Sequence, residues 1–156
     1  MIDWGRTIVS GIVAGIVFVM MEMLLIVFAL GGSLWGPPRM MAAIVLGDGV
    51  LPPPATFDLG IVMAGMIVHF VLSIVYAVVL AFVIRGMSPS VSLAVGAAFG
   101  LALYLINFYG FTAIFPWFAM ARNWVTIISH MTFGAVIALY YRPFGSRLAR
   151  SAATTT

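Results

Sequence analysis

The chain has 156 residues, of which 64% are hydrophobic and only 7% are charged, and its mean hydropathy is +1.22. A soluble domain carries charge on about a quarter of its residues, so this composition excludes a water-soluble globular fold and indicates one embedded in lipid. The seven basic residues are all arginines standing singly between apolar runs, which excludes a nucleic-acid-binding patch, and the absence of cysteine excludes disulfides and thiolate metal sites.

Four apolar segments are long enough to cross a membrane as helices, which takes about 20 residues. The first is predicted over residues 8–30, and its apolar run is too long for a cleaved signal peptide. The second is predicted over residues 59–84 and the third over residues 91–114. The fourth is predicted over residues 124–141, with aromatic residues at both ends as at a membrane interface. No span contains an obvious unwound segment.

The connection between the first two spans is the longest, and it contains a further short helix. Pro37 and Pro38 suit the start of a helix and Gly47 suits its end. The stretch between them is too short to span, so it is predicted to lie at the interface or to fold back against the bundle. The fold class is therefore an all-α integral membrane protein, a four-transmembrane-helix bundle running up-down-up-down with a short interfacial helix in the first outer connection. Residues 1–145 form one transmembrane domain, and residues 146–156 form a disordered cytoplasmic tail.

The arginines are distributed unequally between the two sides of the predicted bundle. One side has Arg39 and Arg122. The other side collects five: Arg6, Arg85, Arg142, Arg147 and Arg150. Because cytoplasmic connections carry the excess of basic residues, both termini are predicted to lie in the cytoplasm, with the chain in a bacterial cytoplasmic membrane.

Glycines in the predicted spans mark places where helices can approach closely. In lipid, helices associate through close packing and hydrogen bonds rather than through the hydrophobic effect. The candidate packing positions are Gly11, Gly15, Gly65, Gly96, Gly100 and Gly134. We expect them to pack helices within the chain, and contact with another subunit is the alternative.

The polar residues inside the spans are the best functional candidates, because a polar group in lipid is costly. Each span has one residue that is either ionisable or a strong hydrogen-bonding amide: Glu22, His69, Asn107 and His130. The helix rise places all four about 9–15 Å from the outer ends of their spans, so they are predicted to form one polar layer. Possible relay or supporting groups for this layer are Ser73, Tyr76, Tyr104, Thr126 and Arg122.

The second and fourth spans resemble each other around their histidines. His69 precedes Ser73 by four residues, and His130 precedes Gly134 by four. The connection before each span contains proline, tryptophan and a single arginine. Two helical hairpins related by an axis along the membrane normal produce such a pattern, and chance repetition is the alternative.

Three interpretations of the polar layer remain open. The leading one is structural: Glu22 is protonated or paired with a histidine, the layer joins helices, and no cofactor is bound. In the second, His69 and His130 clamp haem b, with Arg39 and Arg122 as the only cations for its propionates, or they bind a divalent metal together with Glu22. In the third, the layer conducts protons or a small solute through an oligomer.

Motifs of known enzyme classes are absent from the sequence. There is no lysine for a phosphate-binding loop, and Glu22 is the only acidic residue within a span, so paired catalytic carboxylates are lacking. The chain is therefore predicted to be a non-enzymatic membrane protein that acts by contact. Its expected partners are the lipid bilayer and other membrane subunits or a second copy of itself, as an accessory subunit or a self-associating bundle.

Overall fold

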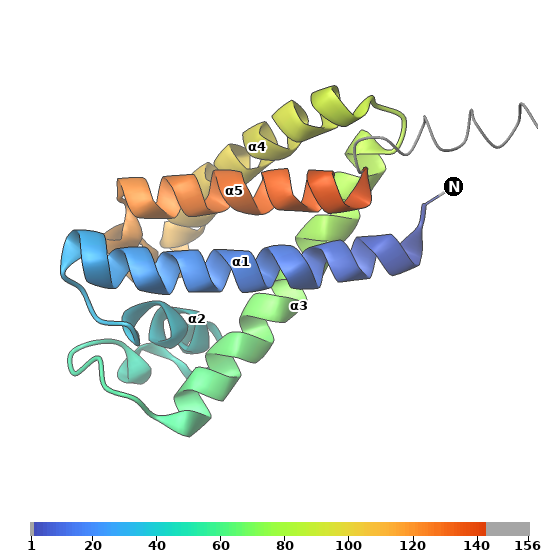
Figure 1. Cartoon of the computed structure of the whole chain (residues 1–156). Coiled ribbons are helices and arrows are strands. Elements are labelled where there is room, and N and C mark those ends of the chain that lie inside the picture. The colour runs from blue at the N-terminus through green and yellow to red at the C-terminus, as the bar shows by residue number, and fades with distance from the viewer. Residues whose placement is uncertain (1, 143–156) are drawn as a thin grey trace, which may run out of the picture.

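We describe the protein from a computed structural model, which covers residues 2–142 (Figure 1). All regular elements in this range are helical, and the five α-helices are α1 (Trp4–Leu30), α2 (Gly36–Leu46), α3 (Leu59–Ile84), α4 (Pro89–Leu105) and α5 (Trp124–Tyr141). Four segments are long and apolar enough to cross a membrane: Trp4–Leu30, Leu59–Ile84, Pro89–Ala113 and Trp124–Tyr141. The prediction of an all-helical membrane protein with four candidate spans is thus confirmed. The predicted tail at residues 146–156, with Arg147 and Arg150, lies outside the described residues.

Polar side chains cap the start of all four long helices, and Ser88 does so for α4. The Asp3 carboxylate accepts a hydrogen bond from the backbone N–H of Arg6, so α1 begins at Trp4 rather than at residue 8 as predicted. Asp58 caps α3 in the same way, and Asn123 caps α5 through the N–H of Thr126. The second and fourth spans have the predicted bounds.

The third span is helical from Pro89 to Ala113, but it is not α-helical throughout. After α4 ends at Leu105, the chain continues as a π-helix, η2 (Ile106–Gly110), and then a 3-10 turn, η3 (Phe111–Ala113). Arg122 supports this segment: its Nε donates to the carbonyl of Phe108 at 2.7 Å, and its guanidinium lies 4.2 Å from the centre of the Tyr109 ring. The π-helix is therefore supported by a residue that lies beyond the span.

The helices are unequally packed against one another (Figure 1). α1 packs against both α3 and α5, and α4 packs along α5. Figure 1 shows α3 and α4 diverging from the turn that joins them, whereas α1 and α5 stay side by side. α2 packs on the first half of α3, so this helix is folded back against the bundle.

Close contacts of α1 with α3, and of α3 with α2, are made at glycines. A Cβ atom added at Gly11 would lie 3.0 Å from the Cβ of Ala77, and one added at Gly15 would lie 2.9 Å from the Ser73 hydroxyl. A Cβ atom at Gly65 would overlap the backbone carbonyl of Pro38 in α2. Three of the six candidate glycines thus lie at contacts within the chain.

The other three candidate glycines bring α4 and α5 together. Gly96 and Gly134 face each other, and a Cβ atom on either would overlap the carbonyl of the other. A Cβ atom at Gly100 would overlap the carbonyl of His130. This backbone-to-backbone contact fixes the height of His130 relative to the third span.

Three arginines donate hydrogen bonds to backbone carbonyls in the segments that connect helices. Arg39 is buried, and its guanidinium donates to the carbonyls of Val50 and Thr56 in the long connection, at 2.9 Å each. Arg142 donates to the carbonyls of Arg85 and Met87 in the α3–α4 turn, at 3.2 and 2.6 Å. With Arg122 on the π-helix, these side chains satisfy backbone groups that lack helical partners.

Candidate functional site

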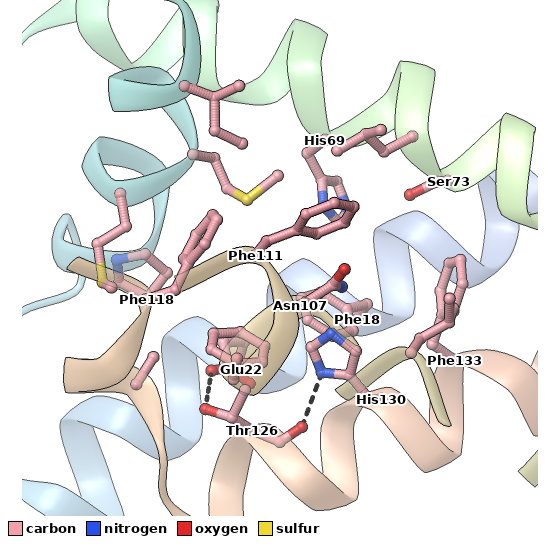
Figure 2. Close-up of a pocket in the computed structure, with 18 of the residues that line it drawn as sticks. Phe18, Glu22, His69, Ser73, Asn107, Phe111, Phe118, Thr126, His130 and Phe133 are labelled. Atoms are coloured by element: carbon pink, nitrogen blue, oxygen red, sulfur yellow. Dashed lines mark hydrogen bonds between the residues drawn. The ribbon is translucent and has the colours of Figure 1, made fainter. Parts of the chain in front are cut away.

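A cavity of about 310 Å³ lies among α1, α2, α3, α5, the end of α4 and the segment that follows α4 (Figure 2). Most of its wall is apolar, and phenylalanines dominate it: Phe18, Phe108, Phe111, Phe115, Phe118 and Phe133. Its polar lining residues are Glu22, His69, Ser73, Tyr76, Asn107, Thr126 and His130. The structure therefore places all four residues of the predicted polar layer around one cavity.

Glu22 and His130 are joined through Thr126. The Thr126 hydroxyl donates to Glu22 Oε1 at 2.8 Å, while the Thr126 carbonyl accepts from His130 Nδ1 at 2.8 Å (Figure 2). Glu22 is only 5% exposed, and its Oε2 has no hydrogen-bond partner within residues 2–142. No arginine or histidine in that range forms an ion pair with Glu22.

The two histidines are held in the same manner. His69 Nε2 lies 2.9 Å from the carbonyl oxygen of Gly15, and His130 Nδ1 bonds to the carbonyl of Thr126. A carbonyl can only accept, so each of these ring nitrogens carries the proton. In the neutral ring the second nitrogen, Nδ1 of His69 and Nε2 of His130, is then an acceptor. Figure 2 shows this nitrogen of His130 turned toward Asn107.

The Phe18 ring lies between the two histidines. Its centre is 5.4 Å from that of His69, nearly parallel to it, and 4.8 Å from that of His130, perpendicular to it. A porphyrin bound by both imidazoles would have to displace this ring. The two arginines considered for haem propionates, Arg39 and Arg122, donate to backbone carbonyls instead. The residues present therefore fit haem poorly.

The residues around the cavity also fit a divalent metal poorly. Within the described residues no three histidine or acidic side chains lie close enough together to hold one ion. Glu22 and His130 share Thr126 as a partner, but His69 is on the far side of Phe18. The candidate set of Glu22, His69 and His130 lines a cavity without forming a compact ligand cluster.

Asn107 comes from the π-helix and reaches α3. Its Oδ1 accepts a hydrogen bond from the Tyr76 hydroxyl at 3.2 Å. The Asn107 amide nitrogen has no hydrogen bond to any residue in the described range, and it is the one uncommitted donor of the four-residue layer. π-helical turns are frequent at functional sites, and here the turn carries the polar residue of the third span.

Two of the predicted supporting residues lie outside the cavity wall. Tyr104 is buried behind the wall, 5.3 Å from the Phe108 ring and 6.1 Å from the His130 ring. Arg122 acts on the backbone of the π-helix. Sequence reasoning missed the aromatic residues that follow α4 and the methionines of α2, Met40 and Met41. Neither group has a helical periodicity that would have predicted a common wall.

The two hairpins repeat one pattern of residues and contacts. The patterns are Gly11-xxx-Gly15-xxxxxx-Glu22 in α1 and Gly96-xxx-Gly100-xxxxxx-Asn107 in the third span, with His69-xxx-Ser73-xxx-Ala77 in α3 and His130-xxx-Gly134-xxx-Ala138 in α5. The contacts agree with the patterns, because Gly11 meets Ala77 just as Gly96 meets Ala138. Glu22 thus corresponds to Asn107, and His69 corresponds to His130.

No family model, curated protein or solved structure matches this chain. The geometry of the cavity therefore carries the functional argument. The cavity offers two uncommitted acceptors, one nitrogen on each histidine, and one uncommitted donor on Asn107. An apolar wall with a few convergent polar groups is the usual form of a small-molecule binding site.

Proposed function

We propose that the protein binds a small, largely apolar molecule with a hydrogen-bonding head group inside the membrane. The cavity carries this proposal: it measures about 310 Å³, its wall is mostly apolar, and Glu22, His69, Asn107 and His130 lie on that wall. An engineered protein cavity of about 150 Å³ holds benzene, so this one is large enough for a substituted ring. The uncommitted polar atoms would orient the head group.

The structural interpretation, in which the polar layer joins helices, explains only part of this layer. It accounts for the bonds from Thr126 to Glu22 and from Tyr76 to Asn107, which cross between helices. It leaves unexplained why both histidines keep a free acceptor beside an open volume. Conduction through one chain is disfavoured, because the half of the bundle away from α2 is filled by fully buried side chains such as Leu80, Ile84 and Ile137.

A role by contact with another subunit remains a separate hypothesis. All six candidate glycines are used for packing within the chain, so they no longer argue for a further partner. Chemical crosslinking in native membranes tests this role. A specific crosslinked neighbour that persists in variants with a filled cavity would favour contact over ligand binding.

We further propose that the four spans alternate in direction, with α2 at the extracytoplasmic interface and both termini in the cytoplasm of a bacterial membrane. The arginine distribution supports this orientation. The chain has no cysteine, so single-cysteine variants give a clean test. We expect Asp48→Cys to react with an impermeant thiol reagent in whole cells and Ser88→Cys to react only after lysis; the reverse pattern would refute this orientation.

A pair of matched substitutions in α4 tests ligand binding. Leu103 is 5% exposed and lines the cavity, whereas Leu105 is 50% exposed and does not. We expect Leu103→Trp to abolish binding of tetramethylbenzene by the purified protein and Leu105→Trp to leave it unchanged, as measured by equilibrium dialysis in mild detergent. Equal binding by both variants would contradict the proposal.

A further inference from the structure

We infer that the cavity selects an aromatic ring bearing hydroxyl groups, a hydroquinone or a phenol, whose hydroxyls donate to His69 and His130. This inference rests on the proposed function and names its ligand class. It follows from the kind of hydrogen-bonding atoms that remain free, from the aromatic wall and from the repeated position of the histidines.

The free polar atoms favour a ligand that donates. Both histidines give their N–H to backbone carbonyls, of Gly15 and Thr126, which leaves an acceptor nitrogen on each ring. A carbonyl head group has no proton to donate to either of these nitrogens. A hydroxyl supplies the missing proton.

The wall of the cavity suits a planar ring. Its phenylalanines already meet edge to face: Phe18 with Phe133 at 6.0 Å, and Phe108 with Phe118 at 5.5 Å between ring centres. Aromatic rings prefer these perpendicular contacts or offset stacking. A further ring would extend the cluster, whereas a flexible alkyl chain of equal volume would gain no such contacts.

The repeat places the two acceptors on opposite hairpins. His69 of α3 and His130 of α5 hold corresponding positions, and their rings flank Phe18 from two sides. A ring placed beside Phe18, rather than between the histidines, could donate one hydroxyl to each of them. We therefore expect a hydroquinone to bind more tightly than a phenol with a single hydroxyl.

Phe111 marks where such a molecule would enter. It lines the cavity and yet is 40% exposed, so it stands at the boundary between the cavity and the exterior. It belongs to the 3-10 turn that follows the π-helix (Figure 2). An exposed aromatic side chain at this boundary suits entry of an apolar ring from the lipid.

Three probes of one carbon skeleton test the inference on the unmodified protein. They are tetramethylhydroquinone, which donates, tetramethylbenzoquinone, which only accepts, and tetramethylbenzene, which does neither. Dissociation constants are measured in mild detergent under argon. We expect the hydroquinone to bind at least about tenfold more tightly than the other two, since two hydrogen bonds are gained.

The outcomes separate this inference from the proposed function. If all three probes bind equally, the cavity holds apolar rings and the hydroxyl preference is refuted. If none binds, the proposed function itself fails. As a check on the residues, His69→Phe and His130→Phe should each weaken hydroquinone binding about threefold, since each removes one of the two hydrogen bonds, while tetramethylbenzene still binds. Weakened binding of both probes would instead indicate a disrupted cavity, and an unchanged preference for the hydroquinone would overturn the role of the histidines.

Discussion

The contact between α4 and α5 gives the sharpest prediction for stability. At Gly134 an added Cβ atom would overlap the carbonyl oxygen of Gly96, which is a backbone atom of the facing helix. No flexible side chain can yield there, so the helices must move apart. Overpacking of this kind costs about 1–3 kcal/mol, against which alanine gains up to about 1 kcal/mol of helix propensity over glycine. We expect Gly134→Ala to lower the free energy of unfolding by about 1–2 kcal/mol.

Unfolding by titration with sodium dodecyl sulfate from mild micelles, followed by circular dichroism, measures this change. Gly60→Ala in α3 is the matched control, because the nearest atom to its added Cβ is an Asp58 carboxylate oxygen at 3.4 Å. We expect this control to be neutral or slightly stabilising. If Gly134→Ala proved as stable as the unmodified chain, or if the control lost as much, the packing argument would be refuted.

Three further substitutions address the polar layer and the π-helix. Glu22→Gln keeps an oxygen that accepts from Thr126, so the midpoint of thermal unfolding should stay nearly unchanged; a large drop would show that the carboxylate itself is required. Thr126→Val removes that donor and leaves a buried carboxyl without a partner, which should cost about 1–2 kcal/mol by the same unfolding titration. Arg122→Lys cannot reproduce the planar guanidinium that bonds to the Phe108 carbonyl, so hydrogen exchange over residues 106–113 should quicken about tenfold, and exchange at the original rate would refute its supporting role.

The spans were readable from the sequence because hydrophobicity and length decide insertion into lipid. The bounds of the second and fourth helices follow from capping residues, Asp58 and Asn123, next to long apolar runs. The depth estimate for the polar layer relied on the constant rise of a helix, and the structure places Glu22, His69, Asn107 and His130 around one cavity. Their functional role stays a prediction.

Features that depend on contacts between residues far apart in the chain could not be predicted from the sequence. The π-helix is supported by Arg122, which a hydropathy pattern cannot associate with Phe108. The position of Phe18 between two histidines depends on how α1 faces its neighbours, since α1 is apolar nearly all round. The divergence of α3 from α4 (Figure 1) likewise has no signal in the composition of either helix.

Photolabelling tests most directly whether a small molecule occupies this cavity. The purified protein in mild detergent is irradiated with a small apolar diazirine-benzene, with and without excess tetramethylbenzene, and labelled residues are mapped by mass spectrometry. We expect competition to reduce labelling of Phe118 and Leu103, which line the cavity, and to spare Phe28, which is 82% exposed. Labelling that is confined to exposed positions, or that competition lowers equally everywhere, would contradict an intramembrane binding site.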